Sequence, residues 1–199
     1  MNFKTLFLAA LSGLLLTACI PSVYPFYTER EVVFEKKVIG EWRVVNDDKQ
    51  PEHWNFAHSR NSHYDLTVTD NEGKTGEFRA TMFKLDDELF LDLMPTDCEY
   101  ASSQNDLVSA SMFPGHLLVH VSQLEPELRM SFCDFDWLGD YLEENPKALA
   151  HRRSEHGMVL TGTTRELQRF VIKHLKEGKL FDDYGTLKKQ TYSDQPASQ

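Results

Sequence analysis

Alternation of apolar and polar residues with a period of two runs through the first two thirds of this chain, and it constrains the fold more than any other feature. Trp54 and Phe56 alternate with polar neighbours, and segments 64–69 and 128–132 repeat the pattern. Successive side chains of a strand point to opposite faces, so this period is typical of half-buried strands. Further strands are predicted at 31–34, 38–45, 77–85, 88–94 and 116–122. Most connections are short and polar, which favours an antiparallel meander.

The final third of the chain follows the period of a helix instead. Residues 134–144 carry apolar side chains at helical spacing and end before Pro146, which predicts a short helix. Residues 151–161 favour one more strand. Thr163 and Glu166 then have the spacing of a capping box, and an apolar stripe follows them, which predicts an amphipathic helix packed on the core.

Strands followed by a late helix indicate a mainly β fold with a C-terminal helix, in the α+β class. We expect the meander to form a small barrel or a strongly curved sheet with the helix packed against it. A length of 199 residues suits one ordinary domain. We place that domain at residues 31–181 and expect residues 182–199 to be a largely flexible tail.

The first eighteen residues have the pattern of a targeting segment. Lys4 precedes an apolar stretch that is shorter than the roughly 20 residues of a membrane-spanning helix. The run Leu16-Thr17-Ala18-Cys19 resembles the lipobox of bacterial lipoproteins. That resemblance implies that residues 1–18 are a cleaved signal peptide and that Cys19 carries the acyl chains of a membrane anchor. An ordinary secretory signal that ends near a cysteine is the alternative.

The residue after the cysteine bears on location. It is Ile20, whereas an Asp at this position tends to retain lipoproteins at the inner membrane. The resemblance therefore implies an outer-membrane lipoprotein that faces the periplasm of the bacterial cell envelope. Residues 19–30 are rich in proline and aromatic side chains, and two interpretations are open for this lipidated segment: a brief, stiff tether near the lipid headgroups, or a strap packed on the domain.

The formal net charge of −10 limits the classes of partner. An acidic chain is poorly suited to nucleic acid, and it is equally poorly suited to hold anionic lipid through a basic patch. We therefore expect no nucleic-acid partner, and we expect the membrane to be reached through the acyl anchor alone.

Two cysteines remain besides Cys19. In the oxidising compartment that the lipobox implies, Cys98 and Cys133 can form a disulfide. Cys133 lies in a predicted strand, so a buried thiol is the alternative.

One motif indicates a ligand. Gly40-Glu41-Trp42, at the start of an early predicted strand, resembles the Gly-x-Trp signature of lipocalins. That resemblance implies a lipocalin-like barrel that holds a small hydrophobic molecule. The long segment 95–114 has the length of a lid or binding loop, so we expect it to be the entrance element if the barrel holds a ligand; plain disorder is the alternative. The residues expected to line the barrel are Trp42, Trp54, Phe56, Tyr64 and Leu91. A barrel of eight strands can equally fill its interior with its own side chains.

A broader resemblance runs along the chain. Its segments are Tyr24-Pro25-Phe26-Tyr27-Thr28, Phe83-Lys84-Leu85, Glu88-Leu89-Phe90-Leu91-Asp92, Leu124-Glu125-Pro126 and Glu166-Leu167-Gln168. They are similar to uncharacterised bacterial lipoproteins. This resemblance implies the anchor and implies no chemistry.

No pattern in the sequence indicates catalysis or a cofactor. There is no Gly-x-Ser-x-Gly elbow, and the eight histidines lack the spacing and cysteine partners of a metal centre. We therefore expect no enzyme, no metal and no cofactor. Two hypotheses remain: a lipoprotein that binds a small hydrophobic ligand in its barrel, and a non-enzymatic module that interacts with an envelope protein at the outer membrane.

Overall fold

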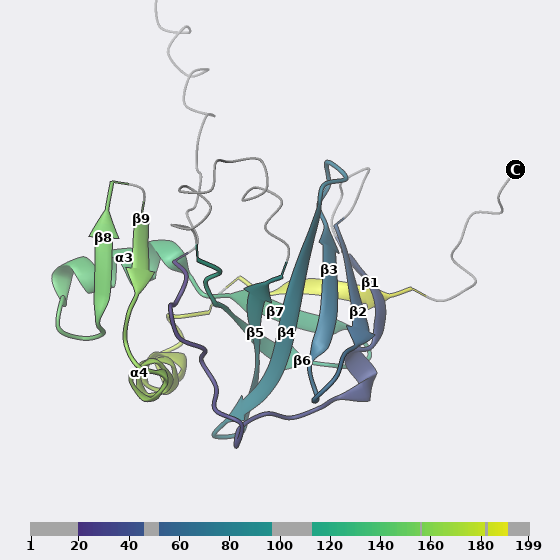
Figure 1. The fold of residues 1–199 in the computed structure, drawn as a ribbon, viewed down its shortest axis with the longest axis horizontal. Helices are drawn as coiled ribbons and strands as arrows, with labels where there is room; N and C mark the ends of the chain where they lie inside the picture. The colour runs from purple at the N-terminus through teal and green to yellow at the C-terminus, as the bar shows by residue number, and fades with distance from the viewer. Residues whose placement is uncertain (1–19, 46–51, 97–112, 156, 182, 191–199) are drawn as a thin grey trace, which may run out of the picture.

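Eight antiparallel strands form a closed barrel in the computed structural model, which describes residues 20–45, 52–96, 113–155, 157–181 and 183–190. The spatial order is β1-β10-β7-β6-β5-β4-β3-β2 (Figure 1). The strands are β1 Gly40–Val44, β2 His53–His58, β3 Tyr64–Thr69, β4 Thr75–Leu85, β5 Glu88–Pro95, β6 Leu117–Gln123, β7 Leu128–Phe132 and β10 Gly185–Lys189. The predicted mainly β fold is confirmed, and the sheet closes fully instead of only curving.

A second layer is inserted between β7 and β10, and it lies beside the barrel in Figure 1. It contains α3 Phe135–Glu144, the hairpin of β8 His151–Ser154 and β9 Gly157–Leu160, and α4 Thr164–Lys176. Both helices begin at a cap visible in the sequence. The Asp134 carboxylate accepts the Trp137 backbone N–H at 2.9 Å, and Thr163 with Glu166 forms the predicted capping box. The single strand expected at 151–161 is a two-stranded hairpin.

The molecule has two apolar cores that share one wall. Inward-facing side chains such as Met82, Leu91 and Val119 fill the barrel. Their neighbours Phe83, Phe90 and Leu118 face outward and pack against α3, α4 and the hairpin. The second half of β4 and most of β5 and β6 are therefore buried on both faces, which explains why their apolar runs are nearly continuous.

The N-terminal segment 20–35, here called the strap, packs along the outer wall of the barrel (Figure 1). Ser22 exchanges both backbone hydrogen bonds with His116, and the Val33 N–H donates to the Met82 carbonyl at 2.9 Å. Ile20 and Phe26 are buried in the core between barrel and helices. Of the two interpretations of residues 19–30, the structure therefore has the packed strap from Ile20 onward. The strand expected at 31–34 is part of this strap and pairs only through a bridge from Val32 to Phe83.

The closing strand β10 lies in the segment expected to be a flexible tail. It pairs with both β1 and β7, so the domain extends beyond residue 181. Leu187 is its buried residue and faces the barrel core, whereas its neighbours are a threonine and two lysines. One apolar residue in five gives almost no alternation, which is why the sequence pattern did not reveal this strand.

The short helix η1, Lys36–Val38, closes the end of the barrel from which β1 starts. Val38 is fully buried among the interior side chains, and the Trp42 indole donates to its carbonyl at 2.7 Å. Gly40 follows with φ of +128°, and a Cβ there would meet the Lys189 side chain at 3.0 Å. The glycine of the Gly-x-Trp motif thus permits the turn into β1 and leaves room for the Lys189 side chain.

Candidate functional site

The five residues expected to line a ligand cavity all lie inside the barrel, where they pack into a continuous core. Trp42, Phe56, Tyr64 and Leu91 are at most 1% exposed, and Trp54 is 4% exposed. The phenol of Tyr64 accepts the Glu35 N–H at 2.7 Å and donates back to the Glu35 carbonyl, while burial raises its pKa. The interior volume proposed for a ligand is therefore occupied by the protein's own side chains.

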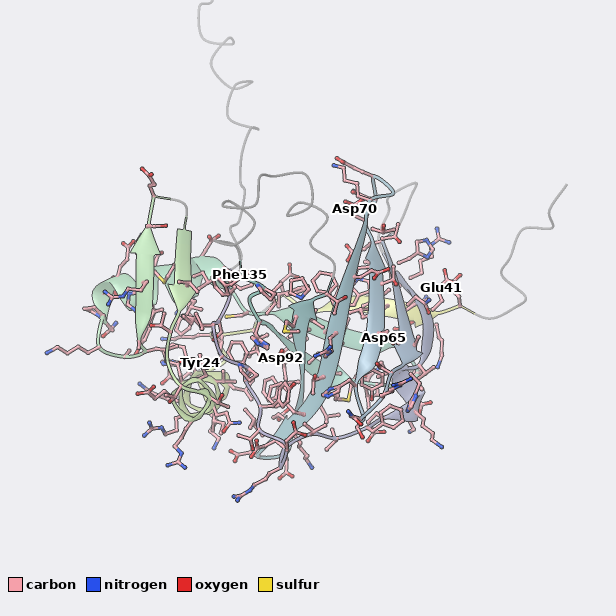
Figure 2. The ribbon with its side chains drawn as sticks, viewed as in Figure 1. Tyr24, Glu41, Asp65, Asp70, Asp92 and Phe135 are labelled. Carbon is pink, nitrogen blue, oxygen red and sulfur yellow. The ribbon has the colours of Figure 1, made fainter. Side chains whose placement is uncertain are left out.

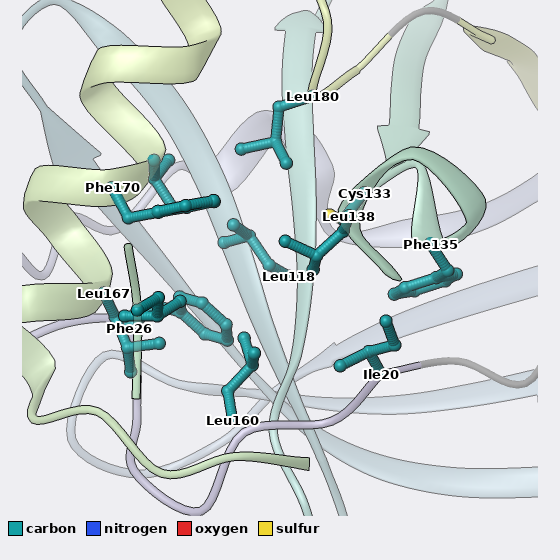
Figure 3. Close-up of a pocket in the computed structure, with 12 residues that line it drawn as sticks. Ile20, Phe26, Leu118, Cys133, Phe135, Leu138, Leu160, Leu167, Phe170 and Leu180 are labelled. Carbon is teal, nitrogen blue, oxygen red and sulfur yellow. The ribbon is translucent and has the colours of Figure 1, made fainter. Parts of the chain in front are cut away.

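A small apolar cavity lies outside the barrel, between its wall and the helical layer (Figure 3). Its volume is about 10 Å³, which is room for a single water molecule. The lining is apolar throughout: Ile20, Phe26, Leu118, Cys133, Phe135, Leu138, Leu149, Leu160, Leu167, Phe170, Val171 and Leu180. The strap, β6, both helices and β9 all contribute to it, so this small gap lies where the parts of the second core meet.

A buried carboxylate holds the strap to the barrel wall. Asp92 is 1% exposed and lies on the outward face of β5 (Figure 2). One of its oxygens accepts the Phe26 backbone N–H at 2.9 Å, and the other accepts the His116 Nδ1–H at 2.6 Å. Charge-assisted hydrogen bonds of this kind compensate the burial of a carboxylate.

The arrangement orients the His116 imidazole, as an aspartate does in hydrolase triads. Ser22, the strap residue paired with His116, is fully buried, so no substrate can reach its hydroxyl.

His120 is a buried histidine on β6, four residues after His116. Its Nε2–H donates to the Glu88 carboxylate at 3.1 Å, and its Nδ1 therefore accepts the Tyr184 hydroxyl at 2.5 Å. The rings of Phe90 and Phe181 pack against the imidazole at centroid distances of 5.0 and 5.3 Å. Burial lowers the His120 pKa, and the Glu88 carboxylate opposes this with a smaller effect.

His174 on α4 lies in an aromatic cage at the contact between the two helices. Its ring centroid is 4.4 Å from Phe170, 4.7 Å from Tyr141 and 5.1 Å from Trp137. The Nδ1–H donates to Glu177 at 2.9 Å, while the buried Nε2 has no hydrogen-bond partner within the described part of the chain. The cage contains no carboxylate or cysteine suited to share a metal.

A polar hollow of about 560 Å³ opens at the turn between β2 and β3. Its lining residues are His58, Ser59, Arg60, Asn61, His63, Asp65 and Arg79. The turn is tied by two backbone hydrogen bonds, from Ser59 N–H to the His63 carbonyl and from His63 N–H to the Arg60 carbonyl. Asn61 and Ser62 both have φ near +60°. We call this site the arginine hollow.

The cysteine positions are only partly within the structure. Cys19 and Cys98 lie outside the described residues, as does most of the entrance element expected at 95–114, so the lipidation site and the disulfide stay predictions. Cys133 is buried and lines the apolar cavity. Within the described ranges no group of three or more histidine, cysteine or acidic residues could hold a metal, and no helix is long and apolar enough to cross a bilayer.

Comparison with known proteins adds no relative. No protein-family model, no curated protein and no solved structure matches the chain. The resemblances to lipocalins and to other lipoproteins therefore remain expectations.

The role of Asp92 in holding the strap is the feature that sequence reasoning missed. The signal was present in the run Phe90-Leu91-Asp92-Leu93, where a single carboxylate interrupts apolar residues of a doubly buried strand. Such a carboxylate requires fixed donors. The need for N–H donors to the Asp92 carboxylate would have indicated that another segment packs on the outer face of that strand.

Proposed function

We propose that this protein is a lipid-anchored lipoprotein of the bacterial cell envelope whose domain is a non-enzymatic interaction module held directly against the outer membrane. Cys19 would carry the acyl chains, and the domain would face the periplasm. The filled barrel would serve as a rigid scaffold, and its outer surface would contact the partner.

The observation that supports this proposal most is the packing of Ile20. It is 7% exposed and belongs to the core between barrel and helices, although it directly follows the predicted lipidation site. The next residues are fixed by backbone hydrogen bonds to His116, just before β6, and to Leu160 on β9. An anchor at Cys19 would thus join the folded domain without any flexible tether, and the domain could not move far from the bilayer.

Acylation itself is tested by substitution of the anchor cysteine. The Cys19→Ser chain should lose incorporation of a clickable fatty acid and should leave the membrane fraction or accumulate unprocessed. The Cys133→Ser chain is the matched control and should keep the label. Label that persists on the Cys19→Ser chain would refute the anchor.

Close contact with the bilayer needs a separate test. A fluorescent amino acid at Tyr24, which is 48% exposed, would lie at most about 18 Å along the chain from Cys19. Its emission in reconstituted vesicles should be quenched by nitroxide-labelled lipid headgroups, whereas a probe at Asn61 in the arginine hollow should not be quenched. A long Gly/Ser insertion between Cys19 and Ile20 should abolish the quenching while the acyl label persists. Equal quenching with and without the insertion would contradict a tether-free domain.

A small hydrophobic ligand is the second candidate function. The supporting observation is the cavity beside Ile20, because every side chain that lines it is apolar. A fatty acyl chain is far larger than this cavity, so α3 and α4 would have to separate to admit it. Saturable binding of a fluorescent fatty acid, lost on Leu138→Trp substitution, would support this function. Absence of saturable binding would exclude it.

A further inference from the structure

The arginine hollow places two guanidinium groups together on an otherwise acidic molecule. The chain has 31 acidic and 21 basic side chains, yet the hollow contains Arg60 and Arg79 against the single carboxylate of Asp65. His58 and His63 line the same space and can add N–H donors. The local charge therefore has the opposite sign to that of the whole chain.

Both arginines lack an ion pair within the described residues, whereas several exposed lysines have one. Lys37 pairs with Glu125 at 2.6 Å and Lys176 pairs with Asp86 at 3.1 Å. Arg79 stands directly opposite Asp65 in the β3–β4 register and still makes no ion pair with it. The planar, five-donor fork of each guanidinium is thus available to an external acceptor.

The two histidines of the hollow are held by contacts within the folded domain. The His63 Nδ1 lies 2.9 Å from the Thr81 hydroxyl oxygen, and Thr81 in turn donates to the Tyr27 hydroxyl of the strap at 3.3 Å. On the other side, the His58 ring meets the Phe34 ring edge-on at 4.9 Å. These two rings therefore lose little side-chain freedom when a ligand binds.

The hollow lies far along the strap from the predicted anchor. Its histidines meet the strap at Phe34 directly and at Tyr27 through Thr81, whereas Ile20 packs against the helical layer. In Figure 2, Asp65 lies on the barrel well to the right of Tyr24, which lies beside the helical layer near the start of the strap. The opening therefore does not border the point at which an anchored chain would enter the bilayer.

From these observations we propose that the arginine hollow binds a phosphate-class oxyanion, with the forks of Arg60 and Arg79 as its principal donors. Arginine forks match the paired oxygens of phosphate groups, and charge-assisted hydrogen bonds to them are about twice as strong as neutral ones. Asp65 lowers the positive potential of the hollow and so limits the affinity. This inference does not depend on the proposed anchor, because the hollow is complete within the domain.

The test is titration of the full Cys19→Ser chain with inorganic phosphate at constant ionic strength, followed by the NMR shifts of the turn amides. We expect saturable shifts at residues 59–63. The double variant Arg60→Ala/Arg79→Ala should weaken binding by at least about tenfold, since each charge-assisted pair contributes on that scale. Asp65→Asn should strengthen it. The matched control Arg43→Ala/Arg152→Ala removes two exposed arginines elsewhere and should bind as the parent chain does.

Two further arms separate the sources of the phosphate group. Vesicles of phosphatidylglycerol present the phosphate group on a lipid, and vesicles of phosphatidylcholine serve as the reference. Binding of the unlipidated chain to these vesicles should not depend on Arg60 and Arg79. Acetate should bind more weakly than phosphate. The proposal is overturned if phosphate shifts do not saturate, if they persist in the double variant while its fold is unchanged by circular dichroism, or if only vesicles are bound. Each result is independent of acylation, so failure here leaves the anchor proposal standing.

Discussion

Asp92 shows how a single residue joins two parts of the molecule. Its side chain is buried on the outer wall of the barrel, where it accepts hydrogen bonds from the strap at Phe26 and from His116 at the start of β6. A buried carboxylate without donors would destabilise the fold, so the carboxylate and the strap depend on each other. The strap is therefore held at one defined position by hydrogen bonds, in addition to its apolar contacts.

Substitution of Asp92 by Asn should loosen the strap. The amide keeps one acceptor oxygen but loses the charge that both hydrogen bonds use, so we expect a loss of about 2–4 kcal/mol in the free energy of unfolding. Urea denaturation followed by tryptophan fluorescence measures this loss, and amide exchange at Phe26 should accelerate.

The control for that substitution is Asp87→Asn, because the Asp87 side chain is fully exposed in the neighbouring turn. It should change the free energy of unfolding by less than about 0.5 kcal/mol. Equal effects of the two substitutions would mean that the Asp92 carboxylate does not hold the strap.

His120 makes stability depend on pH with a definite sign. Burial lowers its pKa in the folded state below the ordinary value of 6.5, so the unfolded chain takes up the proton first as the pH falls. The contribution of His120 is thus fully present above pH 6.5 and is lost as the pH falls below that value. The groups that face it are the Glu88 carboxylate, the Tyr184 hydroxyl and the rings of Phe90 and Phe181.

A pair of variants isolates this effect. His120→Gln should reduce the decline in unfolding free energy between neutral and mildly acidic pH, by at most about 1.4 kcal/mol per pH unit. Glu88→Gln removes the carboxylate that raises the His120 pKa, so its decline should be steeper than that of the parent chain. Urea denaturation across the pH series measures both slopes. If the free energy of unfolding changes with pH in the same way in all three chains, the pH dependence does not come from His120.

At the scale of elements, the sequence predicted what depends on local periodicity. The bounds of β3 and β7 and the start of α4 follow directly from alternation and from the capping box. The inward orientation of Trp54 and Phe56 was also predictable, because it needs only the period of two. Whether those side chains enclose a cavity depends on how eight strands fill a common interior, and no single strand contains that information.

Elements stabilised by distant partners were not predictable in the same way. β10 has one buried apolar residue and is held by its pairing on both sides, with the Lys189 ammonium 5.1 Å above the Trp42 ring. The strap has no regular period, because it follows the wall of another element. The arginine hollow combines a turn with residues on β3 and β4, so its residues meet only in the folded chain.

On the scale of the whole molecule, the order of the elements along the chain links the two cores. The helical layer is inserted before the strand that completes the barrel, and the strap crosses from that layer to the barrel end. β4, β5 and β6 supply apolar side chains to both cores. We therefore expect barrel and helical layer to unfold as one cooperative unit and not as two separate domains.

Removal of the closing strand tests this view of the whole fold. A chain ended after Phe181 lacks β10, which leaves β1 and β7 as open edges and removes Leu187 from the barrel core. Open strand edges pair with other chains, so this variant should self-associate in size-exclusion chromatography with light scattering and lose its near-ultraviolet circular dichroism. A chain ended after Gln190 retains every described strand and should stay monomeric with the parent spectrum. A monomeric Phe181 variant with an intact spectrum would mean that β10 contributes little and that seven strands suffice to hold the barrel core.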